Sequence, residues 1–160
     1  MDKLALRLMI RDEELRAIGH VAAQWAYLET KIDTLISLLD SHASQNGRVR
    51  SDRQSSAERV AKLRSLAREI LTGAPLEELL DILEKSSSLR GFRDDIVHGT
   101  WHLHRNGGEL TTGITVLSRR PSFKSKTVKF TAEKAEGIAA KISKQSVRIT
   151  VWRTKYVRLA

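Results

Sequence analysis

Apolar residues recur every three or four positions between residues 12 and 40. Residues three and four apart lie on the same face of a helix, so this spacing predicts one long helix with a single buried side. The polar segment 41–52 contains Asn46-Gly47, a pair typical of turns, and is predicted to be a loop. The apolar stripe comprises Ile18, Val21, Trp25, Leu28, Ile32, Leu35, Ile36 and Leu39.

Two further helices are predicted between residues 55 and 99. Ser55 and Glu58 have the spacing of a capping box, which marks the beginning of a helix. That helix can end at Gly73, and Pro75 suits the first turn of the next one, which is predicted to end at Gly99. Short breaks between consecutive helices favour an antiparallel, up-and-down bundle.

The periodicity changes to two after Gly99. Trp101 and Leu103 alternate with His102 and His104, which predicts a strand, and Asn106-Gly107 predicts a hairpin turn. The elements expected next are a returning strand (110–117), a basic loop (118–125) and a short strand (127–130).

A last helix is predicted from Thr131, which can cap it, to about residue 158. Segment 147–151 is rich in β-branched residues, so a strand there is the alternative. The helical spacing is carried by Ala135, Ile138, Ala139, Ile142, Ile149, Trp152 and Tyr156.

These elements predict a mainly α (α+β) fold, an antiparallel bundle of about four helices with a small β-hairpin or sheet inserted before the last helix. The 160 residues suit a single domain over 1–160. Its expected parts are a three-helix part (12–99), a hairpin with a basic loop (100–131) and a C-terminal helix (131–158).

The chain is strongly basic, with 28 Lys and Arg against 19 Asp and Glu and a formal charge of +9. This excess favours a polyanionic partner, with nucleic acid ahead of an anionic membrane surface, although a basic surface without a function remains the alternative. The chain has no cysteine, which excludes disulfides and thiolate chemistry and favours the cytoplasm. No apolar run is long enough to span a membrane, so no membrane association is expected.

Two charged residues fall on apolar helix faces. At about 100° per residue, Arg93 lies in the middle of the stripe of the third helix, and Glu29 lies on the inner face of the first. Because an unpaired charge in a core is costly, Glu29 and Arg93 are predicted to contact each other. The alternative is that such a pair only fixes the register of the helices.

His98 lies in the final turn of the third helix, close to Asp94 on the helical wheel. There it can donate or accept a proton. Its alternative role is to satisfy the last carbonyl groups of the helix. His102 and His104 could join His98 as metal ligands, but no acidic residue has a matching spacing, so no metal is expected.

An arginine followed directly by a polar residue, with four to six residues between that arginine and a histidine near a helix end, resembles the motif of HEPN (higher eukaryote and prokaryote nucleotide-binding) proteins. Arg93, Asp94 and His98 occupy these positions. The resemblance covers residues 12–99, whereas the hairpin and last helix do not match the family. It implies a metal-independent endoribonuclease of a toxin, antiviral or RNA-processing system, or an inactive relative that serves as a binding module.

The resemblance also implies roles for individual residues. His98 would be the general acid or base, Arg93 would stabilise the phosphorane, and Asp94 would orient either of them. No cofactor is implied, and many members are homodimers whose two motifs share a cleft; a toxin would also have an antitoxin partner. The residues expected to hold RNA are Arg119, Arg120, Lys124, Lys126 and Lys129, with Glu29 and His102 supporting the site.

Aromatic residues offer a further possibility. Trp101, Trp152 and Tyr156 could stack on nucleic-acid bases, but their apolar spacing points first to a core or a dimer interface.

Overall fold

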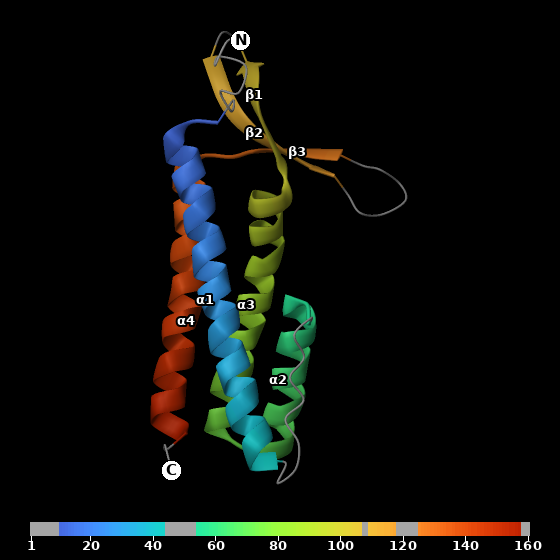
Figure 1. Ribbon diagram of the computed structural model, residues 1–160, viewed down its shortest axis with the longest axis vertical. Helices are drawn as coiled ribbons and strands as arrows, with labels where there is room; N and C mark the ends of the chain where they lie inside the picture. Colours follow the sequence, from blue (N-terminus) through green and yellow to red (C-terminus); the bar gives the residue numbers. More distant parts are fainter. Residues whose placement is uncertain (1–9, 44–53, 107–108, 118–124, 158–160) are drawn as a thin grey trace, which may run out of the picture. The chain divides into compact units, whose positions relative to one another are not determined.

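The computed structural model describes residues 10–43, 54–106, 109–117 and 125–157 (Figure 1). It confirms a mainly helical protein with strands inserted before the last helix. No described helix has an apolar stretch long enough to cross a membrane. The elements are α1 (Asp12–Ala43), α2 (Ser56–Ile70), α3 (Ala74–His98), β1 (Thr100–Asn106), β2 (Glu109–Leu117), β3 (Ser125–Lys129) and α4 (Ala132–Tyr156).

The chain divides into two compact units. The first comprises Met1–Ala23 and Gly91–Ala140, and the second comprises Gln24–Arg90 and Lys141–Ala160. Helices α1, α3 and α4 each contribute residues to both units. The expectation of a single domain stays a prediction.

The second unit is a bundle of helical segments with an apolar core. The predicted stripe of α1 is buried from Trp25 to Leu39, which confirms that helix. Each fully buried aliphatic side chain contributes roughly 1.5–3 kcal/mol. The other helices supply the buried residues Leu63 and Ala67 from α2, Leu79, Ile82, Leu83, Ser86 and Leu89 from α3, and Ile142, Gln145, Ser146, Ile149 and Trp152 from α4.

Helix α4 continues through the β-branched segment 147–151, so the alternative of a strand is wrong. A β-branched residue costs at most about 0.7 kcal/mol in a helix relative to alanine. Burial of Ile149 and Trp152, each about 1% exposed, outweighs that cost. Thr131 caps the helix as predicted, because its Oγ1 accepts a hydrogen bond of 3.2 Å from the backbone N–H of Lys134.

Helix α2 begins with the predicted capping box. The carboxylate of Glu58 accepts a 2.7 Å hydrogen bond from the backbone N–H of Ser55, and the Ser55 hydroxyl oxygen accepts one from the Glu58 backbone N–H. The helix ends at Ile70, before the predicted Gly73, because Leu71 is already extended. Gly73 has a φ of +63° and instead precedes α3, where glycine avoids the steric cost of the left-handed region.

Helices α1 and α2 run in the same direction, which corrects the predicted up-and-down order for this pair. In the contacts between them, the residue numbers of both partners increase together: Trp25 with Ser56, Asp33 with Arg59, and Asp40 with Lys62. Along α3 and α4 the numbers run in opposite senses, as predicted, from Glu78 with Lys155 to Asp81 with Arg148. Helix α1 also extends to Ala43, beyond the predicted start of the loop at residue 41.

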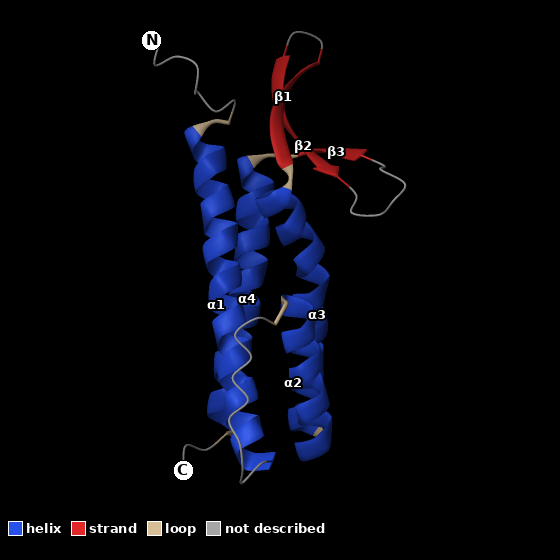
Figure 2. Ribbon diagram, turned by 45° about the vertical axis from the view of Figure 1, so that its right-hand side comes forward, coloured by secondary structure: helices blue, strands red, loops and turns tan. Residues whose placement is uncertain are grey.

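The first unit contains a three-stranded antiparallel sheet in the order β1-β2-β3 (Figure 2). Thr100 pairs with Thr115 and Asn106 with Glu109, which confirms the hairpin. Gly107 of the predicted turn lies outside the described residues. The third strand pairs with β2 from Gly113–Lys129 to Leu117–Ser125.

Candidate functional site

The C-terminal end of α3, in the first unit, brings together Arg93, Asp94 and His98. The helix is closed by a 3.0 Å hydrogen bond from the backbone N–H of Gly99 to the carbonyl of Asp95, after which the chain enters β1. His98 is therefore the last helical residue, and its side chain is exposed.

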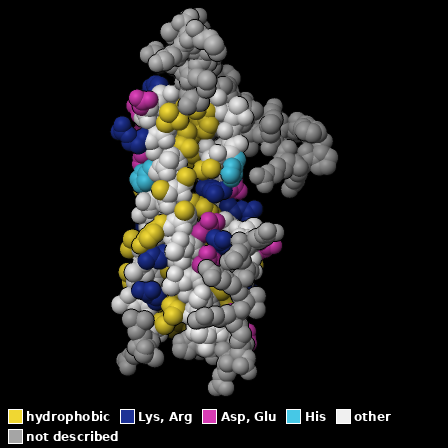
Figure 3. Space-filling view, viewed as in Figure 1, with side chains coloured by type: hydrophobic (Ala, Val, Ile, Leu, Met, Phe, Trp, Pro, Cys, Tyr) yellow, Lys and Arg dark blue, Asp and Glu magenta, His cyan; other side chains and the backbone are white. Residues whose placement is uncertain are grey.

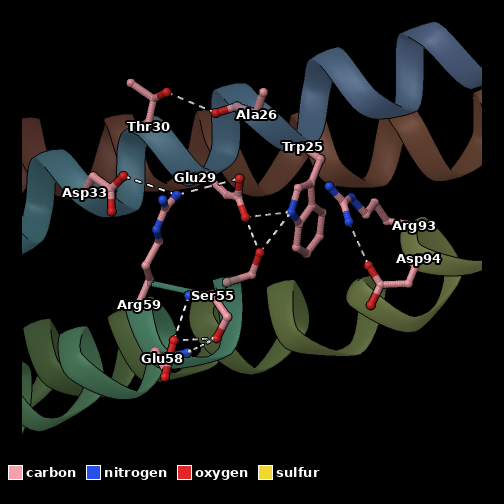
Figure 4. A network of polar contacts seen from close by, with 11 residues as sticks. Trp25, Ala26, Glu29, Thr30, Asp33, Ser55, Glu58, Arg59, Arg93 and Asp94 are labelled. Carbon is pink, nitrogen blue, oxygen red and sulfur yellow. Dashed lines mark hydrogen bonds and ion pairs between the residues drawn. The ribbon is translucent and has the colours of Figure 1, made fainter. Parts of the chain in front are cut away.

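Arg93 bridges the two other residues. Its Nη1 donates a 2.8 Å hydrogen bond to Oδ1 of Asp94, drawn in Figure 4. The same Nη1 lies 3.0 Å from Nε2 of His98. The Arg93 side chain is 23% exposed and that of Asp94 is 42% exposed, so a solute can reach the cluster.

The protonation of His98 follows from this geometry. A guanidinium group has donors and no acceptor, so Nε2 of His98 must accept the hydrogen bond from Arg93. His98 is then neutral, with its ring proton on Nδ1. The site thus holds an unprotonated imidazole nitrogen, which can act as a general base. Beside it lies a permanent positive charge, which can stabilise an anion.

The remaining predicted site residues of the first unit are not brought to this cluster by any described contact. Arg119, Arg120 and Lys124 lie outside the described residues. The backbone of Lys126 pairs with Val116 in the sheet, and that of His102 pairs with Gly113, but their side chains lie outside the described part. The same holds for the side chains of His104 and Lys129. The roles proposed for all of them stay predictions.

Glu29 belongs to a polar network in the second unit, shown in Figure 4. Its Oε1 accepts a 3.0 Å hydrogen bond from the indole N–H of Trp25 and a short one from the hydroxyl of Ser56. Its Oε2 lies 3.6 Å from Nη1 of Arg59. Arg93 belongs to the first unit, so the predicted Glu29–Arg93 contact stays a prediction.

Arg59 also pairs with Asp33, at 3.3 Å. Burial raises the pKa of Asp33 above its ordinary value, Arg59 opposes this rise, and the nearby negative charge of Glu29 adds to it. Nη1 of Arg59 thus lies close to the carboxylates of both Glu29 and Asp33.

Three contacts in the first unit were not predicted. The indole N–H of Trp101 donates a 3.0 Å hydrogen bond to the carbonyl of Ile96, two residues before His98. Nδ1 of His20 lies 2.6 Å from a carboxylate oxygen of Glu136. Glu14 is fully buried and accepts hydrogen bonds from the backbone and guanidinium of Arg11.

The sequence carries only weak signals for these contacts. An acidic residue in the first turn of a helix is common at the surface, so nothing marked Glu14 as buried. His20 lies off the apolar stripe of α1. Trp101 was assigned to an apolar face, but the partner of its N–H depends on how β1 leaves α3.

Charges of both signs lie side by side on the face of the molecule in Figure 3. Such mixing agrees with the many ion pairs of the described residues, among them Arg64 with Glu84 and Lys85 with Asp81. Exposed pairs of this kind contribute little to stability, because water screens their charges.

Comparisons of the chain with models of protein families, with curated proteins and with solved structures found no match. A function is therefore inferred from the chemistry of the chain's own residues. Among these, the cluster of Arg93, Asp94 and His98 joins a neutral base to a cation at an accessible helix end.

Proposed function

We propose that this chain is a HEPN-like, metal-independent endoribonuclease that cuts single-stranded RNA. The observation that supports the proposal is the 3.0 Å contact between Arg93 and His98, with Asp94 on the same guanidinium nitrogen. Arg93 thereby contacts both of the other motif residues. The formal charge of +9 favours a polyanionic substrate.

The chemistry needs no external nucleophile. Nε2 of neutral His98 takes the proton of the RNA 2′-hydroxyl, whose oxygen attacks the adjacent phosphorus. Arg93 turns from Nε2 to the phosphate, where its charge stabilises the phosphorane. The 5′-oxygen then leaves with a proton, and the products carry a 2′,3′-cyclic phosphate and a 5′-hydroxyl. Asp94 orients the guanidinium of Arg93 so that the guanidinium can move from Nε2 to the phosphate.

The departing 5′-oxygen needs an acid, and each chain supplies one histidine in this motif. A homodimer with two facing motifs would provide a second His98, which donates a proton to the leaving oxygen after Arg93 has left its Nε2 and that nitrogen has been protonated. We therefore include a homodimer in the proposal, with a toxin or antiviral role in the cytoplasm and, for a toxin, an antitoxin protein as partner.

One observation favours a second candidate, a HEPN-like module that binds nucleic acid or protein without cutting. Arg93 is already held by Asp94 at 2.8 Å, which partly neutralises the charge that a phosphate would meet. If this pair does not open, the cluster stabilises the end of α3 and has no catalytic role.

The deciding experiment incubates the purified chain with structured and unstructured RNAs in EDTA. Wild type is compared with His98→Ala and Arg93→Ala, and with His20→Ala as a control that removes another exposed histidine. All variants are first checked for folding by circular dichroism. Cleavage that gives 2′,3′-cyclic phosphate ends, is lost in the first two variants and is retained in the control supports the ribonuclease. RNA binding without cleavage supports the second candidate.

A further inference from the structure

Trp101 is bound to the end of the helix that carries the proposed site. The last carbonyl groups of an α-helix have no partner within the helix and must find donors elsewhere. At the end of α3, the carbonyl of Asp95 accepts from the backbone N–H of Gly99 at 3.0 Å. The next carbonyl, that of Ile96, accepts from the indole N–H of Trp101 at 3.0 Å.

The ring of Trp101 is itself held in place. It meets the ring of Phe130 edge-on, with centroids 5.1 Å apart and planes at 89°. This arrangement is favourable for aromatic rings and is worth about 0.5–1.5 kcal/mol beyond burial. Phe130 is buried and directly precedes the cap of α4. One side chain thus joins the end of α3, the start of β1 and the entry to α4.

The contact between Arg93 and His98 depends on the conformation of the last turn of α3. Residues five apart lie about 140° from each other around a helix, whereas neighbours on one face are three or four apart. Arg93 therefore reaches Nε2 only by extending its long side chain around the last turn. A change in that turn, which contains Ile96 and His98, separates the two groups.

We propose that Trp101 is a positioning residue for His98, acting through the Ile96 carbonyl to fix the last turn of α3 and so the hydrogen bond from Arg93 to Nε2. This deepens the proposed ribonuclease and rests on it for the catalytic consequence. The structural consequence, the position of the proton on His98, is independent of catalysis.

The test replaces Trp101 by phenylalanine, which keeps an aromatic ring against Phe130 but loses the N–H donor. Trp152→Phe is the matched control, because the indole N–H of Trp152 also donates to a backbone carbonyl, that of Pro75 at 2.8 Å, in the second unit. Incorporation of 3-benzothienylalanine at position 101 gives a variant that keeps the indole shape without the N–H, in case Trp101→Phe does not fold.

The first readout is the imidazole ¹H–¹⁵N spectrum of the full chain, with the His98 signals assigned by their loss in His98→Gln. Wild type and Trp152→Phe are expected to show neutral His98 with the proton on Nδ1. Both position-101 variants are expected to shift toward the form protonated on Nε2. His98 signals that are unchanged in a folded position-101 variant would overturn the inference.

The second readout is RNA cleavage. In the position-101 variants kcat is expected to fall about tenfold or more with KM nearly unchanged, since small misplacements of catalytic groups cost up to about 10² in rate. If wild type cuts no RNA, the proposed function fails while the spectrum still decides the role of Trp101. If wild type cuts RNA and both kcat and the His98 spectrum stay at wild-type values, the role of Trp101 fails alone.

Discussion

Nη1 of Arg93 lies 3.0 Å from Nε2 of His98, on a helix where residues five apart do not share a face. Because the guanidinium can only donate, the imidazole of His98 is neutral and its basic nitrogen Nε2 is covered by the guanidinium of Arg93. An anion that attracts Arg93 uncovers that nitrogen. In the proposed ribonuclease, binding of the RNA phosphate would therefore also expose the base.

Arg93→Lys tests whether charge alone is sufficient. Lysine keeps the positive charge but is a point charge without the planar fork, so it cannot serve Asp94 and His98 from the same geometry. RNA cleavage is expected to fall at least tenfold while RNA affinity, measured by fluorescence anisotropy, changes less than threefold. Cleavage at the wild-type rate would show that the fork is not needed.

Glu29 is predicted to stabilise the second unit mainly as a hydrogen-bond acceptor. Glu29→Ala removes the acceptor of the 3.0 Å hydrogen bond from the indole N–H of Trp25. We expect a loss of about 1–3 kcal/mol in the free energy of unfolding, measured by urea denaturation. Glu29→Gln keeps an acceptor oxygen and should lose less than half as much. Equal losses would point to the ion pair with Arg59 instead.

Asp33→Asn is expected to stabilise the protein near neutral pH. The pKa of Asp33 is raised in the folded chain, first by burial, so its ionised form is less favourable there than in the unfolded chain. The contribution of Asp33 to stability is therefore present below its ordinary pKa and is lost as the pH rises through the folded pKa.

The gain in Asp33→Asn should accordingly appear in thermal melts at pH 7 and fade on acidification toward pH 3. It should also shrink in a Glu29→Gln background, because the charge of Glu29 is one cause of the raised pKa. A variant that is less stable than wild type at pH 7 would mean that the pair with Arg59 outweighs the cost of burial.

Ser55→Ala removes the cap of α2. Loss of a serine cap costs about 1 kcal/mol. The pKa of Glu58 is lowered first by the backbone N–H of Ser55 and then by its hydroxyl, and the variant loses only the hydroxyl. Ser65→Ala, at an exposed position inside the same helix, is the control and should be neutral or slightly stabilising, since alanine is the better helix former. Chemical denaturation of both variants measures the difference.

Local patterns in the sequence were sufficient for most elements. The stripe from Val21 to Leu39 and the pair Ser55–Glu58 act within one helix, so spacing alone predicts them. The predicted direction of α2 relative to α1 is wrong. That direction depends on tertiary contacts such as Arg59 with Asp33, which no periodicity reveals.

The candidate site was predicted in composition but not in geometry. Arg93, Asp94 and His98 were chosen from their spacing, and the wheel placed Arg93 and His98 on different sides of the helix. Their contact depends on a long side chain reaching around the axis, which a wheel of Cβ directions does not represent. The role of Trp101 could not be foreseen because it requires the path of β1 after the helix.

Helix α4 has a consequence for the order in which the chain folds. Its C-terminal half contains Val147, Ile149, Thr150 and Val151, and the two valines are 59% and 58% exposed, so little packing compensates for their weak helical tendency. We expect this half to become helical only when Ile149 and Trp152 dock against the rest of the second unit. Helix α4 follows the other helices in the chain. The apolar side chains of α3 that it covers in the second unit would therefore stay exposed until α4 has been synthesised. During synthesis, this open side is the surface that a chaperone would meet.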